Sequence, residues 1–570
     1  MKKMVIKIIL SIFIIMLLSS ASSMAAAKTP SIVVDGAPIA VSSPLIWDNG
    51  SILISIDDIS SILHASFQWN EMKESVFIQK YGKTILFKIS EDEILKNAGV
   101  ITSPVKPRFI DETFYVPLRI IAEGLGAKVN WDDKGFQIKI TTGDRFSPPE
   151  LATHEVFNAI IAYTDNGHLW ILDGRDENSE PKMITDSGYV ELIGWSNDGK
   201  WLSYKHYANN QSNHAFLWVV SADGNQNRPV DAAPVYDNYL WSPTENKIIY
   251  TIYENTDEGF IPAGIVKCAN ISEDGIEIIT LMEDDLVIIP SVAWYPDGNS
   301  AAISIPRTRY QPPTLEMLGL DGTRKKIYTL EDKEPIDVDN IYPWAFISLK
   351  WSPDGRYIAY HTRMNSASLT ADMVETALLD TENMQVMELD EGLKYPQWLS
   401  FPKSGKKFAY IKGIGRDAIY NKQLEIVNLT DGKIMDLGNE DYVSSGPVWM
   451  KGRHDELFFC CGNTGDDKYI IDDNILPNVM VRDQRIYRLN DNKITKVTEG
   501  MDNTADYYPN PSPDGKQMIF LRLDRYDRGT IYIQSLNEPQ GARKILKGIR
   551  GSAGYYGNYY PEWFKIYWFN

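Results

Sequence analysis

A ten-residue phrase recurs along most of this chain. Residues 351–360 read WSPDGRYIAY, and related phrases begin at Trp195 (WSNDGKWLSY), Trp294 (WYPDGNSAAI) and Pro511 (PSPDGKQMIF). In the phrase, Ser suits the first position of a type I turn, Pro presets φ at the second, and Gly accepts the positive φ that closes a bulged hairpin. The phrase therefore predicts a hairpin turn between a strand that ends in tryptophan and an alternating strand.

Eight copies of the phrase follow one another at spacings of 46 to 62 residues. Their first positions hold Trp195, Trp241, Trp294, Trp351, Trp398, Trp449, Pro511 and Trp563. A second alternating segment follows in each repeat, so every repeat offers three or four strands. Periods of this size predict a β-propeller, whose blades pack against their neighbours. We expect the tryptophans to end the innermost strands and to pack against the adjacent blade.

These phrases resemble the TolB-type propeller repeat, which also occurs in the propeller domains of the prolyl oligopeptidase family. The resemblance covers residues 156–570 and implies the propeller fold. The copies predict eight blades, or seven if one of the degenerate copies at Trp241 and Trp449 is a loop. Residues 559–570 (YYPEWFKIYWFN) are expected to supply the inner strand of a blade begun by residues 160–173, which would close the ring.

A shorter internal repeat precedes the propeller. Residues 54–69 align with residues 116–131 at an offset of 62, with matching apolar positions at helical spacing. Each copy predicts a short helix followed by two strands, with Gly126 as the left-handed cap of the second helix. Residues 114–132 (FYVPLRIIAEGLGAKVNWD) resemble the copper amine oxidase N-terminal-like domain. The resemblance implies a small secreted module without copper chemistry, because the catalytic part of those oxidases is a different domain.

The chain is therefore predicted to be mainly β, with two folded domains. Residues 28–142 form a small α+β domain of two helix-plus-hairpin repeats, residues 143–155 a linker rich in Gly, Ser and Pro, and residues 156–570 the propeller. Residues 1–27 combine lysines, an apolar run and small residues, which is typical of a signal peptide with cleavage near Ala27. The sequence thus predicts a secreted or cell-surface protein with no transmembrane span in the mature chain.

Charge and motifs narrow the function. With 57 Lys and Arg against 76 Asp and Glu, the formal net charge of −19 excludes nucleic-acid binding, which depends on basic surface. The sequence lacks the G-x-S-x-G motif of prolyl oligopeptidase-type hydrolases. The alternative enzyme hypothesis is a propeller lyase or hydrolase that acts on an acidic polysaccharide with a metal in the central channel. His206 and His361 are its candidate residues, although a structural role is the simpler interpretation of both.

Tyrosines precede several of the predicted inner strands. Tyr342, Tyr395, Tyr508 and Tyr560 would then rim one mouth of the channel, where aromatic rings can stack on sugars or grip peptide side chains. Packing between blades is the competing interpretation. The sequence favours an exported, non-catalytic binding or scaffold protein for an extracytoplasmic protein or cell-envelope polymer. It predicts no catalytic residue, metal site or cofactor.

Overall fold

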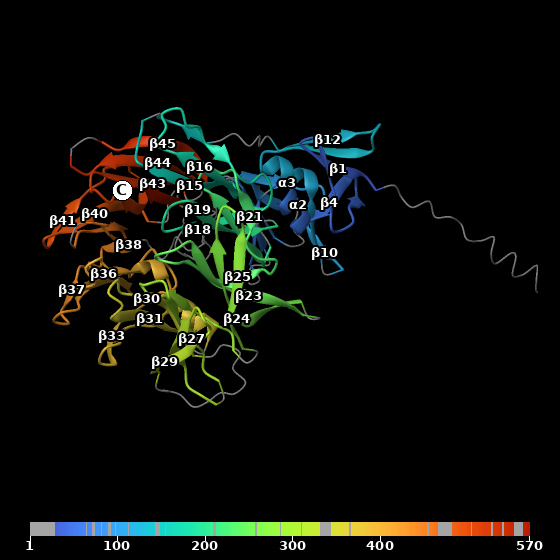
Figure 1. Ribbon diagram of the computed structural model, residues 1–570. Helices are drawn as coiled ribbons and strands as arrows, with labels where there is room; N and C mark the ends of the chain where they lie inside the picture. The colour runs from blue at the N-terminus through green and yellow to red at the C-terminus, as the bar shows by residue number, and fades with distance from the viewer. Residues whose placement is uncertain are drawn as a thin grey trace, which may run out of the picture. The chain divides into compact units, whose positions relative to one another are not determined.

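The computed structural model describes residues 29–569 except 64, 71–74, 81–82, 89–92, 97–98, 112, 143–148, 154, 209–211, 257–258, 285–286, 309, 331–343, 364–365, 453–454, 465–480, 503, 526–527, 538–540 and 552–562. The predicted signal peptide lies outside the described residues. Spatial contacts divide the chain into two compact units, residues 1–145 and 146–570 (Figure 1).

The first unit uses one structural pattern twice. The first copy comprises β3 (Ile46–Asp48), β4 (Ser51–Ser55), α2 (Ile56–Leu63), β5 (Ser66–Asn70) and β6 (Ser75–Lys80). The second copy comprises β10 (Arg108–Ile110), β11 (Thr113–Pro117), α3 (Leu118–Gly124), β12 (Lys128–Asp132) and β13 (Gln137–Thr141). Every element of the second copy begins 62 residues after its counterpart. The predicted repeat of a helix followed by two strands is confirmed.

Five further strands complete the first unit: β1 (Ser31–Val34), β2 (Ala37–Ile39), β7 (Lys83–Lys88), β8 (Glu93–Lys96) and β9 (Gly99–Thr102). Strands β5 to β9 form one sheet, so the first copy extends its hairpin with three strands that the second copy lacks. The two helices pack over one apolar core, which includes Ile59 and Ile121. Gly126 has a φ of 100°, as predicted for the cap of the second helix.

The second unit consists of groups of four antiparallel strands, which we name units A to H. One residue pair joins B to C in a single sheet, and another joins E to F. From the innermost strand outward, the first four contain: unit A, β46 (Phe564–Trp568), β15 (Ala159–Asp165), β16 (His168–Asp173), β17 (Lys182–Met183); unit B, β18 (Tyr189–Trp195), β19 (Trp201–Tyr207), β20 (Ala215–Ser221), β21 (Asn227–Pro229); unit C, β22 (Val235–Trp241), β23 (Lys247–Thr256), β24 (Gly259–Ile271), β25 (Ile276–Glu283); unit D, β26 (Val292–Trp294), β27 (Ser300–Ile305), β28 (Thr314–Gly319), β29 (Arg324–Thr329).

The other four contain: unit E, β30 (Ala345–Trp351), β31 (Tyr357–Arg363), β32 (Val374–Asp380), β33 (Gln385–Gly392); unit F, β34 (Leu399–Ser400), β35 (Lys407–Lys412), β36 (Gln423–Asn428), β37 (Ile434–Asp436); unit G, β38 (Tyr442–Trp449), β39 (Leu457–Asn463), β40 (Arg485–Asn490), β41 (Lys493–Lys496); unit H, β42 (Ala505–Pro511), β43 (Gln517–Arg525), β44 (Arg528–Ser535), β45 (Arg543–Arg550). The short helices α4 (Ala367–Asp372) and η1 (Pro396–Trp398) belong to connections.

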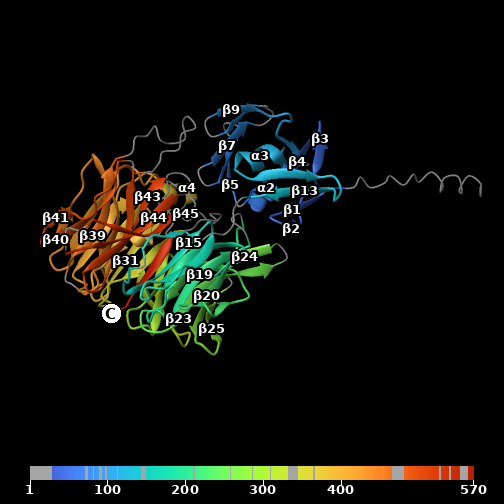
Figure 2. The ribbon, with the colours of Figure 1, turned by 90° about the horizontal axis from the view of Figure 1, so that it is seen from above.

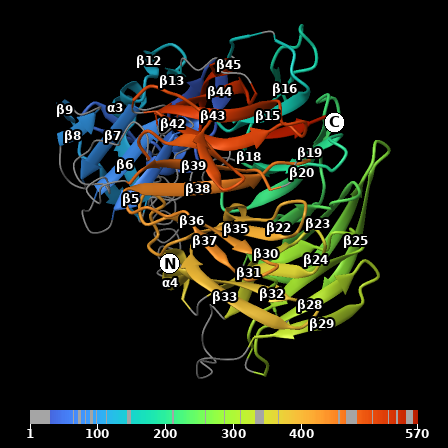
Figure 3. The ribbon, with the colours of Figure 1, turned by 90° about the vertical axis from the view of Figure 1, so that its left-hand side faces the viewer.

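The innermost strands contact one another in chain order. Strand β46 contacts β18, and the contacts continue through β22, β26 and β30 to η1. They continue from η1 and β34 to β38 and on to β42. Figure 3 labels β18, β22, β30, β38 and β42 of this series. Tyr508 of β42 meets Phe564 of β46, with ring centroids 6.1 Å apart, which completes the circle. The predicted propeller fold is confirmed.

The two ends of the propeller share unit A. Strand β46, near the C-terminus, pairs antiparallel with β15, so that Phe564 lies opposite Tyr163 and Trp568 opposite Ala159. Figure 2 labels β15 and marks the C-terminus. This confirms the expected closure. One difference concerns the predicted linker: β14 (Glu150–Leu151), inside the range 143–155, pairs with β45 at the outer edge of unit H. The propeller domain therefore begins earlier than the sequence indicated.

The recurrent phrase forms the predicted turn. The Gly355 N–H donates to the Ser352 carbonyl at 2.9 Å, and Gly355 has a φ of 73°. The Ser352 hydroxyl donates to the Asp354 carboxylate at 2.5 Å and accepts from the Tyr357 N–H at 2.9 Å. These side-chain bonds fix the turn, because they satisfy polar groups that the hairpin leaves unpaired.

The tryptophans at the ends of the inner strands join neighbouring units by hydrogen bonds. The Trp241 indole N–H donates to the Gly194 carbonyl at 2.9 Å, and that of Trp294 donates to the Leu240 carbonyl at 2.9 Å. Each acceptor is the residue directly before the strand end of the preceding unit. The tryptophans therefore set the spacing between units as well as filling the space between them.

Two repeats have a different register from the expected one. In unit F, Ser400 pairs with Ala409, and the equivalent pair in unit E is Lys350 with Ala359. Phe401 therefore occupies the strand-end position that Trp351 has in unit E. Trp398 lies earlier in the chain, in η1. Tyr567 occupies that position in unit A, because it pairs with Ile160. Trp398 and Trp563 are both buried in the core that units A, F, G and H share. The phrase at 401–405 (FPKSG) lacks both Trp and Asp, which hides its register.

Candidate functional site

Each innermost strand has one residue directly before its strand-end position. We call these the axial positions; each is the residue directly before the strand end: Gly194, Leu240, Ala293, Lys350, Ser400, Val448, Asn510 and Ile566. Leu240 is 38% exposed although it lies on an innermost strand. Lys350, Ser400 and Asn510 are half-buried. Among these eight positions Lys350 carries the one ionisable side chain.

A backbone irregularity precedes several axial positions. Asn238, Ser348, Gly446 and Tyr508, each three residues before the strand end, have φ values between 55° and 57°. The pairing register shifts at each of these points. A β-bulge of this kind turns the following side chain to the other face of the strand. The bulge is thus part of the repeat, and it determines where the axial side chains point.

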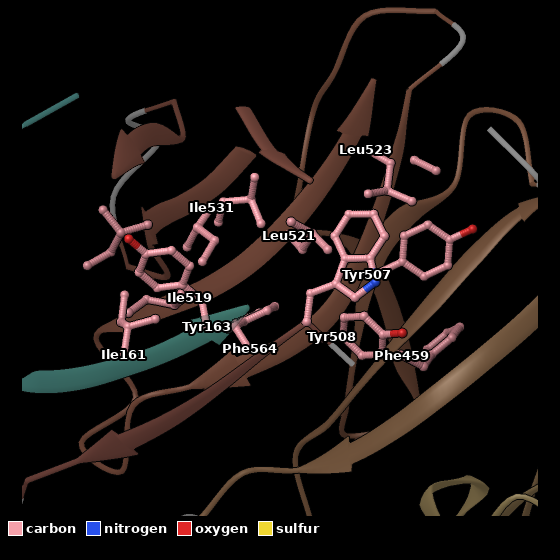
Figure 4. Close-up of a cluster of buried hydrophobic side chains, with 14 of the residues drawn as sticks. Ile161, Tyr163, Phe459, Tyr507, Tyr508, Ile519, Leu521, Leu523, Ile531 and Phe564 are labelled. Atoms are coloured by element: carbon pink, nitrogen blue, oxygen red, sulfur yellow. The ribbon is translucent and has the colours of Figure 1, made fainter. Parts of the chain in front are cut away.

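Two of the four predicted rim tyrosines lie in the described residues. Tyr395 is half-buried, and its ring centroid lies 4.7 Å from that of Trp398. Tyr508 is 8% exposed and packs in the shared core beside Tyr507 and Phe564 (Figure 4). Tyr342 and Tyr560 fall outside the described residues. The binding role of these tyrosines stays a prediction.

Tyr508 has an unusual backbone conformation for its size. Its φ of 57° lies in the left-handed region, which costs a residue with a Cβ atom about 1–2 kcal/mol. Such strain persists only where the surroundings enforce it. Here the strained Tyr508 of unit H packs its ring against Phe564 of β46 in unit A. This contact joins the two units at which the ring closes.

The two candidate histidines lie in different units. In unit B, a ring nitrogen of His206 lies 3.1 Å from the Ser187 carbonyl, and the ring centroid lies 5.3 Å from that of Trp218. His361, in unit E, is 2% exposed, and burial lowers its pKa to about 3. Units C and D separate the two histidines along the ring. In the described part of the chain, no three His, Cys, Asp or Glu side chains gather closely enough to hold a metal ion.

Three buried or half-buried lysines are a feature that sequence reasoning missed. Burial lowers the pKa of Lys350, Lys422 and Lys565 to about 8. The Lys422 ammonium donates to the carbonyls of Ile414 and Tyr420, each at 3.1 Å, which is a structural arrangement. Lys350 differs because it occupies an axial position. The signal in the sequence was a lysine directly before Trp351, where the other repeats have neutral residues.

Comparisons with known proteins agree with this division of the chain. Residues 33–140 match the family model of the copper amine oxidase N-terminal domain. No curated protein matches the sequence. Among the described residues, no helix has the length and apolarity needed to cross a membrane.

Several solved structures resemble the chain at low identity. TolB from Acinetobacter baumannii is 15% identical, with 66% of this chain and 79% of that chain covered and a TM-score of 0.32. A putative TolB from Agrobacterium tumefaciens is 15% identical over 52% and 94%, with a TM-score of 0.27. An oligogalacturonate lyase in complex with manganese is 14% identical over 72% and 96%, with a TM-score of 0.37. Scores of this size determine no function, and the propeller assignment depends on the strand pairing described above. Residues 33–140 thus match a copper amine oxidase N-terminal domain, and a propeller follows them on the same chain.

Proposed function

We propose that this chain is exported and that its propeller is a non-catalytic binding module for an extracytoplasmic polymer or protein. The observation that supports this most directly is the exposure of Leu240, an apolar axial side chain that is 38% exposed. The axial positions lie on inner strands that contact their neighbours around the ring. Convergent apolar and polar groups from different elements are typical of ligand sites. The metal-dependent enzyme stays a second hypothesis, and no observation specifically favours it.

Axial binding can be tested with two matched substitutions in unit C. Leu240→Glu changes the axial position, whereas Ile279→Glu changes a side chain of similar exposure, 43%, on the outermost strand. A buried leucine contributes about 1.5–3 kcal/mol, so Leu240→Glu should weaken retention on cell-envelope fractions by about tenfold or more. Retention of the mature chain is measured by co-sedimentation over a range of envelope concentrations.

The control is Ile279→Glu, which should bind as the unchanged protein does. Digesting the envelope with protease before the assay separates the two ligand classes, since a polymer survives digestion and a protein partner does not. Equal retention of both variants would place the ligand away from the axis. No saturable retention of the unchanged protein on either fraction would contradict the proposed function.

Export makes a separate prediction. We expect N-terminal sequencing of the protein from the culture medium or the cell surface to begin near Lys28, because the small residues before it suit signal-peptide cleavage. Finding the protein only inside cells, with Met1 intact, would remove the export proposal and leave the binding proposal to be judged by the retention assay.

A further inference from the structure

Among the residues that the structure describes, no acidic side chain pairs with the Lys350 ammonium. Its ammonium donates to the Leu399 carbonyl of unit F at 2.6 Å. An ammonium has three donors, and within the described residues the structure pairs Lys350 with this one neutral acceptor. Burial lowers the pKa of Lys350 to about 8. A partly buried cation without an anion is costly unless a ligand supplies the anion.

The bulge at Ser348 determines which way Lys350 points. Ile347 pairs with His361, and Lys350 pairs with Ala359, with the register shift between them. Ala359 belongs to the cluster that unit E forms with unit F, together with Leu399. Paired residues share a face of the sheet, so Lys350 faces unit F as Ala359 does. Residues two apart on a strand also share a face, so His361 faces unit F as well.

Two more polar groups on the same face lack partners. His361 and Thr376 are direct cross-strand partners, each 2% exposed. Among the described residues, neither the Nδ1 atom of His361 nor the Oγ1 atom of Thr376 has a hydrogen-bond partner. The Cβ atoms of paired residues, such as Lys350 and Ala359, are typically about 4.5–5.5 Å apart. His361 lies two residues after Ala359, which is about 7 Å along the strand. The long stem of Lys350 can span that interval.

Among the described residues of the facing unit F, the buried acid already has its partners. Glu425 of unit F is the buried acid on the facing surface, and it already pairs with the Lys412 ammonium at 2.6 Å. The Tyr410 hydroxyl also donates to Glu425. This cluster is satisfied within unit F, which leaves the three groups of unit E for an external ligand.

We propose that Lys350, His361 and Thr376 form a binding site for a carboxylate group, at the boundary of units E and F beside the axis. A carboxylate accepts hydrogen bonds at both oxygens, and an ammonium, a neutral imidazole N–H and a hydroxyl can all donate to it. One lysine balances one negative charge. A phosphate dianion would keep an uncompensated charge in a buried place, so the site suits a carboxylate better. The proposal deepens the proposed function, on which it rests: the ligand carries a carboxylate group.

The probe is sodium glucuronate, with glucose as its neutral counterpart and inorganic phosphate as the other anion. Ligand-observed saturation-transfer NMR on the mature full chain measures binding. We expect glucuronate to bind about tenfold more tightly than glucose or phosphate. Lys350→Met, which keeps the length of the side chain, should weaken glucuronate about tenfold or more, as expected from losing a charge-assisted hydrogen bond.

Two further variants keep the test decisive. Lys565→Met removes another buried lysine, on the inner strand of unit A, and should leave glucuronate affinity within about twofold because it lies outside the site. Thr376→Val replaces a hydroxyl by a methyl of the same shape and should weaken binding about threefold or more even if Lys350→Met fails to fold.

Three outcomes would overturn the site: equal effects of the two lysine substitutions, equal binding of glucose and glucuronate, or no binding of glucuronate. Envelope retention without glucuronate binding would overturn this site alone, whereas glucuronate binding without retention would contradict only the proposed function.

Discussion

Removal of residues 563–570 is expected to open the propeller and to lower its free energy of unfolding by at least about 5 kcal/mol. The deletion takes away β46 and with it the pairing that joins both ends of the propeller in unit A. Trp563 and Phe564 are 3% and 4% exposed in the core shared by units A, F, G and H. Removing a buried aromatic side chain costs about 3–5 kcal/mol each. Urea denaturation followed by circular dichroism measures the loss.

The deletion also has a matched rescue. A synthetic peptide of residues 563–570, added to the shortened chain, should restore part of the stability, because it can pair with β15 as β46 does. Lost stability without any rescue would point to a general folding defect. Unchanged stability of the shortened chain would mean that β46 adds nothing to the closure of the ring.

Local chemistry explains why the hairpins and the ring closure could be predicted. The turn at Ser352 to Gly355 depends on a hydroxyl, a carboxylate and a positive φ. Four adjacent residues supply all three, so the turn can be recognised in the sequence. The strand Phe564–Trp568 is visible as a nearly continuous apolar run, FKIYW, and it pairs with β15 as expected. The two copies of the first unit likewise share a constant offset, which the strand boundaries reproduce.

The candidate site could not be predicted in the same way, because a bulge changes the faces of a strand. Regular alternation would place Lys350 on the face of Phe346, which packs in the cluster of units D and E. The left-handed φ of 55° at Ser348 instead turns Lys350 towards unit F. Nothing in the letters SLKW marks that bulge, since serine has no special preference for this conformation.

The tyrosine prediction met a related limit. A tyrosine shortly before an inner strand can face the channel mouth or the neighbouring blade, and spacing alone does not separate these cases. Tyr508 packs against Phe564 across the closure of the ring. Its position next to the strand was readable from the sequence, whereas the direction of its side chain depends on the bulge that it forms.

Asp506→Ala is expected to destabilise unit H by about 3–5 kcal/mol. Asp506 is 0% exposed and accepts from the Arg522 Nε atom at 2.6 Å and from its Nη2 atom at 2.8 Å. The two residues are direct cross-strand partners on β42 and β43. Alanine would leave the guanidinium, whose side chain is 11% exposed, without its anion. The free energy of unfolding from urea denaturation gives the size of the effect.

The same unit contains an exposed pair for comparison. Arg528 and Asp524 lie 3.0 Å apart with side-chain exposures of 45% and 47%. Asp524→Ala should cost less than about 1 kcal/mol, because water already solvates both charges. Replacing the buried pair by Asp506→Leu with Arg522→Met should recover most of the stability lost in Asp506→Ala, since no charge is then left unpaired. If the double variant is as unstable as Asp506→Ala, the loss comes from the packing of β42, and the ion pair is not what holds this inner strand to its neighbour.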